Sequence, residues 1–285
     1  MKRFFLFITL IVFISLTIGE VVSRCLSLKN RTIDLRNYNS NPGQSIYHPN
    51  KDGYFVFGQL PFIHKTKFTL NDIGFNTPLD FKQFDEDKIN VSFIGDSFVE
   101  GFHVDVTHNF SSILMKKSKR IQSFDFGCSN FNAINYSEVY KYHEMERFDY
   151  VFIVLDMTDL KYENPLRLAR KKYSKIYTYI HLINFLDKGG NILRFFNLIH
   201  FNTLNVSKEL KLDSRVKELI KKKNVHVIVR DSKSLNYLKS RNFHNIIEIL
   251  HDKKPVNFGT SELHYNLNGR ENVINSIISH LKITQ

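Results

Sequence analysis

From residue 90 onward, short runs of apolar residues alternate with longer stretches in which apolar residues recur with a helical period. The short runs are rich in β-branched and aromatic residues, which is typical of buried strands. This alternation favours a parallel sheet covered by helices on both faces. Strands are expected at 90–94, 123–127, 150–155, 225–229 and 245–250, and helices at 107–119, 134–147, 211–223 and 268–282.

Other stretches of the chain do not show this alternation. Residues 26–60 mix Asn, Pro, Gly and Tyr, which predicts an irregular linker and wrapping segment. Residues 165–210 are apolar and aromatic with helical spacing, so they are expected to form core, to contact a membrane surface or to cover a cleft. We therefore divide the chain into an anchor or signal segment (1–25), a linker and wrapping segment (26–85) and an α/β domain (86–285).

The N-terminus carries an uncharged apolar run over residues 4–19, preceded by Lys2 and Arg3 and interrupted by Glu20. The run is slightly short for a bilayer-spanning helix and slightly long for the apolar part of a signal peptide. We expect one membrane helix that contacts the lipid bilayer through residues 4–22, with a cleaved signal as the alternative. The positive residues place the N-terminus inside. The main domain is then periplasmic or extracellular, or secreted if the signal is cleaved.

Composition narrows the class of protein. The chain has 285 residues, of which 42% are hydrophobic and 24% charged, which suits one globular domain with appendages. Two Cys and the lack of any C-x-x-C pair exclude a disulfide scaffold and a structural zinc module. The net charge of +12 comes from scattered residues, and no nucleic-acid motif accompanies them. We expect no nucleic-acid partner, no metal site and no cofactor.

Candidate chemistry is sought after the strands, because ligand sites in parallel α/β sheets lie at the carboxyl ends of the strands. Asp96 and Ser97 follow the first core strand, where a serine can present its hydroxyl to a cleft, although the same residues also suit a helix cap. Glu262 and His264 precede the last helix, where a carboxylate can orient an imidazole, the alternative being a histidine in a surface loop. The combination favours a hydrolase.

In order and spacing these motifs resemble the SGNH/GDSL hydrolases, and more closely the membrane-anchored bacterial type that resembles polysaccharide O-acetyl esterases and acetyltransferases. The resemblance covers roughly residues 45–282. It implies a three-layer α/β/α sandwich with a mostly parallel sheet and flavodoxin-like layering, preceded by the N-terminal membrane helix. The segments that carry it are 71–75, 93–101, 124–130, 154–160 and 262–266.

The resemblance also implies roles for individual residues. Ser97 would be the nucleophile and His264 its base, while Glu262 stands where the family places an Asp that holds the histidine. The backbone N–H groups of Ser97 and Asn130, with the side chain of Thr158, would bind the oxyanion. The family usually has Gly at the position of Asn130 and Asn at that of Thr158, so two of the three oxyanion positions depart from its pattern.

Asp96 and Asp159 are expected to fix loops near the site through hydrogen bonds rather than to take part in chemistry. The resemblance implies an extracytoplasmic esterase or acyltransferase that acts on an acylated polysaccharide or another ester, with acetyl as the expected acyl group. The departures at Asn130 and Thr158 leave an alternative open. In that alternative the chain is a catalytically weakened SGNH-like protein that binds glycan or scaffolds an envelope assembly.

Overall fold

The computed structural model describes residues 2–25, 40–59, 62–129, 131–161, 212–249 and 264–281. The expectations for residues 165–210, like those for Asn130 and Glu262, lie outside the described residues.

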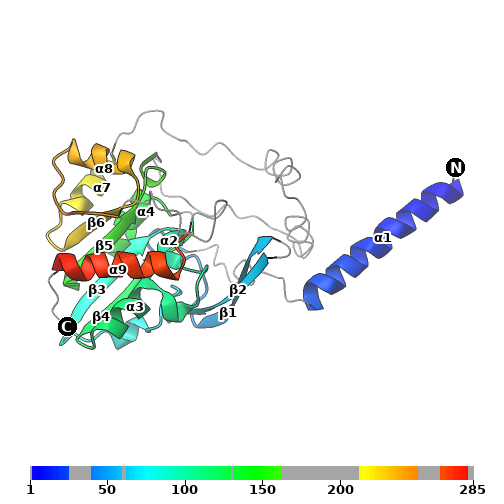
Figure 1. Cartoon of the computed structure of the whole chain (residues 1–285), viewed down its shortest axis with the longest axis horizontal. Helices are drawn as coiled ribbons and strands as arrows, with labels where there is room; N and C mark the ends of the chain where they lie inside the picture. The colour runs from blue at the N-terminus through cyan, green and yellow to red at the C-terminus, as the bar shows by residue number, and fades with distance from the viewer. Residues whose placement is uncertain are drawn as a thin grey trace.

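Five parallel strands form the central sheet, in the order β4-β3-β5-β6-β7 (Figure 1). The chain enters at β3, moves outward to β4 and then returns to the other side of β3. In such doubly wound sheets the crevice at the reversal, here beside the carboxyl ends of β3 and β5, is where ligands bind. The strands are β3 (Ile89–Gly95), β4 (Ile121–Gly127), β5 (Tyr150–Leu155), β6 (Val225–Val229) and β7 (Ile246–Glu248).

Helices cover both faces of the sheet, and each face buries its own apolar cluster. Strand β5 illustrates how this arises, because successive side chains of a strand point to opposite faces of the sheet. Val151, Ile153 and Leu155 pack on one face, and Phe152 and Val154 pack on the other. A strand buried on both faces has a continuous apolar sequence, and this confirms the predicted three-layer α/β/α arrangement. One face carries α4 (Ala133–Tyr142), α7 (Ser214–Ile220) and α8 (Ser232–Lys239), and the other carries α3 (Phe110–Lys117) and α9 (Leu267–Leu281).

An antiparallel hairpin precedes the sheet, formed by β1 (Lys51–Gln59) and β2 (Phe62–Leu70). The prediction of irregular chain is therefore wrong for residues 51–59. Local composition indicates a loop here, but strand formation depends strongly on the partner strand and on packing. Phe55 stacks on Phe102 with 5.6 Å between ring centroids, and Phe68 is fully buried, so the hairpin gains its stability from residues remote in sequence.

The segment before the hairpin packs onto the α/β layers. Ile46 and Tyr47 are buried in the same cluster as the apolar residues of β4 and α4. His143, at the end of α4, lies 3.1 Å from the carbonyl oxygen of Gly43, so its Nε2 must carry the hydrogen that it donates. Burial lowers the pKa of His143 from 6.5 to about 4, and the ring is therefore neutral near pH 7.

Helix ends differ in detail from the expectations. The stretch expected as one helix over 107–119 is a 3-10 turn at Val106–His108 followed by α3, and the stretch 134–147 is α4 followed by a second 3-10 turn at Met145–Arg147. Helix α8 is not anticipated by the sequence pattern. It has only 8 residues and begins where the Asp231 side chain accepts the N–H of Ser234.

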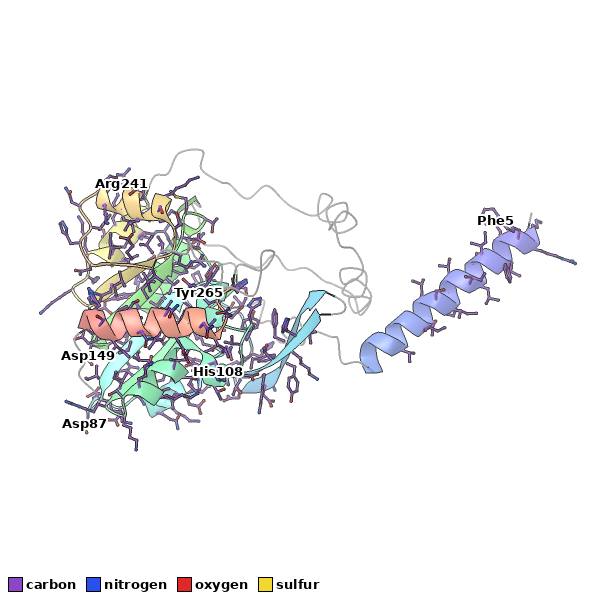
Figure 2. The ribbon with its side chains drawn as sticks, viewed as in Figure 1. Phe5, Asp87, His108, Asp149, Arg241 and Tyr265 are labelled. Carbon is purple, nitrogen blue, oxygen red and sulfur yellow. The ribbon has the colours of Figure 1, made fainter. Side chains whose placement is uncertain are left out.

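Helix α1 (Lys2–Cys25) is apolar on all sides, and Figure 2 shows the exposed side chain of Phe5 near its start. Among the described residues, α1 is the one helix that is long enough and apolar enough to cross a membrane, over Lys2–Gly19, judged by length and composition. None of that stretch is buried. Such a helix is consistent with a signal sequence or with an anchor.

Candidate active site

Ser97 begins a short helix immediately after strand β3. Helix α2 runs over Ser97–Glu100, and the carboxylate of Asp96 accepts the N–H of Phe98 at 3.0 Å, which is the N-cap arrangement. Because β3 ends at Gly95, the cap and the serine lie at the carboxyl edge of the sheet, next to the point where the strand order reverses.

A glycine of the neighbouring strand lets α2 approach the sheet closely. A Cβ atom at Gly127, the last residue of β4, would lie 2.0 Å from the backbone nitrogen of Glu100 and 2.5 Å from the carbonyl carbon of Val99. Backbone atoms cannot yield as a flexible side chain does. The absence of a side chain at Gly127 therefore fixes the position of the helix that carries Ser97.

His264 meets Ser97 across 167 positions of sequence. Its Nε2 lies 2.7 Å from the Ser97 Oγ, and the contact is partly buried. The histidine lies three residues before α9, and Tyr265 beside it is fully buried at that end of the helix (Figure 2). Burial raises the pKa of Tyr265, so this phenol stays protonated. A serine hydroxyl at hydrogen-bond distance from an imidazole nitrogen is the arrangement that activates a nucleophile.

Two rings stack on the His264 imidazole. The ring centroid of His103 is 3.7 Å away with 16° between the planes, and that of Phe98 is 4.7 Å away with 26°. Both residues follow Ser97 closely in the chain. Neither contact is signalled by a motif, and sequence reasoning did not assign a role to either residue.

Thr158, expected to supply an oxyanion donor, is exposed at the carboxyl end of β5. Its hydroxyl donates to an Asp156 carboxylate oxygen, and its backbone N–H donates to the same oxygen at 2.7 Å. Both Thr158 donors are therefore engaged within their own turn. The other expected residues, Asn130 and Glu262, lie outside the described part of the chain.

Asp159 is buried and Asp96 is half-buried, and the carboxylates of both accept backbone N–H groups. Asp159 accepts the N–H of Asp156 at 2.9 Å, which closes the turn after β5, as Asp96 closes the turn before α2. Burial raises the pKa of both carboxyl groups. For Asp159 the neighbouring carboxylates of Asp96 and Asp156 raise the pKa further.

Arg230 is a buried cation close to the carboxyl groups of Asp96, Asp156 and Asp159, which together form an acidic cluster. Sequence reasoning missed this residue. It follows strand β6, is 7% exposed and forms an ion pair with Asp156. Its guanidinium carbon lies 3.1 Å from the centroid of the Phe98 ring. Ser97 was selected because it closely follows a predicted strand. The same rule, applied to the residue after β6, would have pointed to Arg230.

Glu100 joins three segments around α2. Its carboxylate is 2% exposed and accepts the hydroxyl of Tyr47 at 2.7 Å and the backbone N–H of Ser129 at 2.9 Å. The Ser129 hydroxyl also donates to it. Charge-assisted hydrogen bonds of this kind are stronger than neutral ones, so Glu100 joins the wrapping segment and the loop after β4 to the helix that carries Ser97.

Arg270 connects the two stretches that carry the serine and the histidine. It lies in α9, is fully buried and donates from Nη2 to the carbonyl oxygen of Phe98 at 2.9 Å. Burial lowers the pKa of Arg270 to about 10 and raises that of the nearby Asp125 to about 7. Arg270 therefore keeps its charge at neutral pH, where its attraction favours ionised Asp125 and opposes the effect of burial on that carboxyl.

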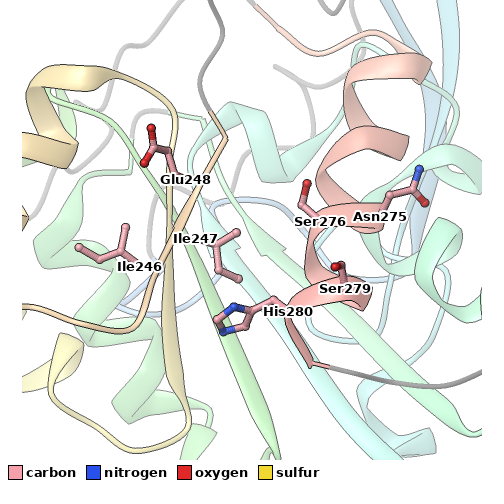
Figure 3. A pocket seen from close by; sticks show the side chains of 7 residues that line it. All are labelled: Ile246, Ile247, Glu248, Asn275, Ser276, Ser279 and His280. Carbon is pink, nitrogen blue, oxygen red and sulfur yellow. The ribbon is translucent and has the colours of Figure 1, made fainter.

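Among the described residues no group of His, Cys, Asp and Glu is arranged to hold a metal ion. A pocket between β7 and α9 is lined by Ile247, Glu248 and His280 among others (Figure 3). His280 is near the last residue of the 15-residue helix α9, whereas His264 precedes its first. The α9 residues that line the pocket begin at Asn275, which at 1.5 Å per residue is about 12 Å along the helix from Leu267, and neither Ser97 nor His264 lines the pocket.

Among solved structures, the chain is similar to a member of the lipolytic G-D-S-L family from Veillonella parvula DSM 2008, with 11% identity and a TM-score of 0.37 over 68% of this chain and 99% of that one. It is also similar to a carbohydrate esterase whose active site displays divergent catalytic and non-catalytic binding functions, with 14% identity and a TM-score of 0.37 over 83% and 85% of the two chains. A third similar structure is the psychrotrophic esterase EstA from Pseudoalteromonas sp., with 10% identity and a TM-score of 0.34 over 68% and 97%.

No protein-family model matches the chain, and no curated protein matches it. Two of the similar solved structures are described as lipolytic G-D-S-L proteins, at 11% and 12% identity.

Proposed function

We propose that this chain is a serine esterase or acyltransferase that acts on an ester, with O-acetyl as the expected group, of an extracytoplasmic glycan. The observation that carries the proposal is the 2.7 Å distance between Ser97 Oγ and His264 Nε2, at the carboxyl edge of a doubly wound sheet. A hydroxyl is a weak nucleophile until a base at this distance takes its proton.

In the proposed reaction, Ser97 Oγ forms a bond to the ester carbonyl carbon while its proton passes to His264 Nε2. The carbonyl oxygen takes the negative charge. The bond to the alcohol oxygen then breaks, and His264 returns the proton to that oxygen, which leaves the acyl group on Ser97. Water or a sugar hydroxyl attacks this acyl-serine, gives its proton to His264, and releases the acid or the transferred ester as Ser97 recovers its hydrogen.

Supporting residues complete the proposal. Glu262 is assigned to hold the His264 ring from its other nitrogen, which stabilises the imidazolium formed during attack. The backbone N–H groups of Ser97 and Asn130 are assigned to the oxyanion, whereas Thr158 is assigned to the turn after β5, because both of its donors bond to Asp156. Since Lys2 and Arg3 lie at the start of α1, ahead of its apolar residues, the domain is assigned to the outer side of the cytoplasmic membrane.

The test uses the full-length protein in detergent, with p-nitrophenyl acetate and an O-acetylated polysaccharide as substrates and released nitrophenolate or acetate as the readout. Ser97→Ala is expected to lower turnover by about 10³-fold or more. Ser137→Ala, which removes a serine hydroxyl that donates to the Ile134 carbonyl in α4, is the matched control and is expected to keep full activity. Equal turnover in the wild type and Ser97→Ala would contradict the proposal.

A second candidate function is a weakened SGNH-like domain that binds glycan without turning it over. The engagement of both Thr158 donors by Asp156 favours it, because the loss of one oxyanion donor costs about 10²–10³ in rate. This function would be supported over the esterase if the wild type and Ser97→Ala bound glycan equally and the wild type released no acetate.

A further inference from the structure

His103 is buried against the candidate base, although no reaction step described above uses it. It lies in the loop after α2 and is 8% exposed. With 3.7 Å between the ring centroids and 16° between the planes, the faces of His103 and His264 are in van der Waals contact. The His264 imidazole therefore cannot tilt toward His103 without displacing it.

The hairpin holds His103 in place. Phe55 of β1 meets the His103 ring edge-on, with centroids 5.0 Å apart and 69° between the planes. Phe55 is itself fixed by its stacking on Phe102 at 5.6 Å. A shift of His103 would thus require a shift of the hairpin, which makes the ring a rigid neighbour rather than a mobile side chain.

Phe98 adds a second flat neighbour, stacked on His264 at 4.7 Å. The Arg230 guanidinium lies over the Phe98 ring, and its ion pair with Asp156 fixes it there. The base therefore has two stacked ring contacts, each supported by a further group of the fold.

We infer that His103 is a positioning residue whose ring holds the plane of the His264 imidazole, so that Nε2 stays directed at Ser97 Oγ. This inference rests on the proposed function. The lone pair of Nε2 lies in the ring plane, so a ring that tilts loses the 2.7 Å hydrogen bond. A misplacement of about 1 Å in a reacting group can cost about 10²-fold in rate.

The kinetic test compares His103→Ala, which removes the ring, with His103→Phe, which keeps a flat face. In full-length protein with p-nitrophenyl acetate, His103→Ala is expected to lower kcat about 10-fold or more with KM within about twofold, and His103→Phe to restore kcat to within about threefold of wild type. His108→Ala is the matched control, since His108 lies five residues after His103, in the 3-10 turn Val106–His108, and bonds to Thr107. His103→Gln replaces the alanine variant if that variant melts early.

A second readout does not depend on turnover. Diethyl pyrocarbonate modifies neutral imidazole nitrogens, and mass spectrometry gives its rate at His264. We expect modification several-fold faster in His103→Ala than in the wild type or His103→Phe, because the ring face is uncovered. Equal modification rates in all three proteins, or a kcat in His103→Ala equal to that of wild type, would overturn the inference. An inactive wild type with the expected modification pattern would overturn the proposed function alone.

Discussion

Asp156, a member of the acidic cluster, contacts both Arg230 and Thr158, the residue expected to donate to the oxyanion. One of its oxygens accepts both Thr158 donors and the other pairs with Arg230. Arg230 in turn covers the Phe98 ring that stacks on His264. The turn after β5 is thereby coupled to the candidate base, and Asp156 arranges groups around the reaction without being assigned a step in it.

This arrangement gives a prediction for Thr158→Val. Because the hydroxyl donates to Asp156, its removal is expected to lower kcat by less than about threefold, whereas the loss of a true oxyanion donor costs about 10²–10³. The measurement is kcat for p-nitrophenyl acetate. A loss of 10²-fold or more would show that the hydroxyl leaves Asp156 during the reaction and binds the oxyanion.

Sequence reasoning selected Ser97 and His264 as candidate residues because each lies beside a recognisable turn at the end of a strand or before a helix, and the structure places their side chains 2.7 Å apart. It did not identify His103 or Arg270. Both act through contacts with residues far away in the chain, and neither the stacking on His264 nor the bond to the Phe98 carbonyl leaves a pattern in the local sequence.

At the scale of elements, the packing of α2 against β4 fixes the position of Ser97. We expect Gly127→Ala to lower the free energy of unfolding by about 1–3 kcal/mol, because its Cβ would lie 2.0 Å from the Glu100 nitrogen and overpacking has a cost of that order. The displaced helix should also lower kcat. Thermal melting and turnover of the variant measure both effects, and a variant with wild-type melting and wild-type kcat would contradict this role of the glycine.

The hydrogen bond from His143, at the end of α4, to Gly43 of the wrapping segment predicts that the folded protein loses stability in acid. The pKa of His143 is about 4 in the folded protein and 6.5 ordinarily, so between these values the unfolded chain binds more protons and stability falls as pH falls. From pH 7 to pH 4.5 this lowers the free energy of unfolding by about 2–3 kcal/mol. Urea unfolding of the full-length protein at the two pH values measures it.

The matched variant for this experiment is His143→Gln, which keeps a side-chain donor but does not titrate. The pKa of Asp125, raised to about 7, acts in the opposite sense, since its contribution is lost as pH rises through 7. The difference between wild type and variant therefore isolates His143. Equal pH slopes in the two proteins would show that the buried ring does not govern acid stability.

The core strands were predictable because a strand buried on both faces is a continuous apolar run, as in β5. The hairpin was not, because the residues that stabilise β1 are its partner strand and Phe102, both beyond the window of a local pattern. Helix α8 was missed for a different reason. Its 8 residues give too short an apolar period, and the Asp231 cap alone does not distinguish a helix from a turn.

For the whole molecule, the apolar helix α1 precedes the α/β domain and is consistent with either a membrane anchor or a signal sequence. We expect the full-length protein to sediment with membranes and to remain there after an alkaline carbonate wash, since a helix with an uncharged apolar run over residues 4–19 leaves a bilayer only at a large cost. N-terminal sequencing supplies the second readout. A soluble protein that begins near Glu20 would replace the anchor with a cleaved signal.

The proposed activity of the whole molecule depends on the contact between Ser97 and His264, which lie in remote parts of the chain. A fluorophosphonate probe tests it, because an activated serine oxygen attacks the phosphorus and displaces fluoride. Peptide mass spectrometry of the full-length protein is predicted to find the adduct on Ser97, formed about 10²–10⁴-fold more slowly in His264→Ala. An unlabelled Ser97 in the folded wild type, or equal labelling rates with and without His264, would contradict the account.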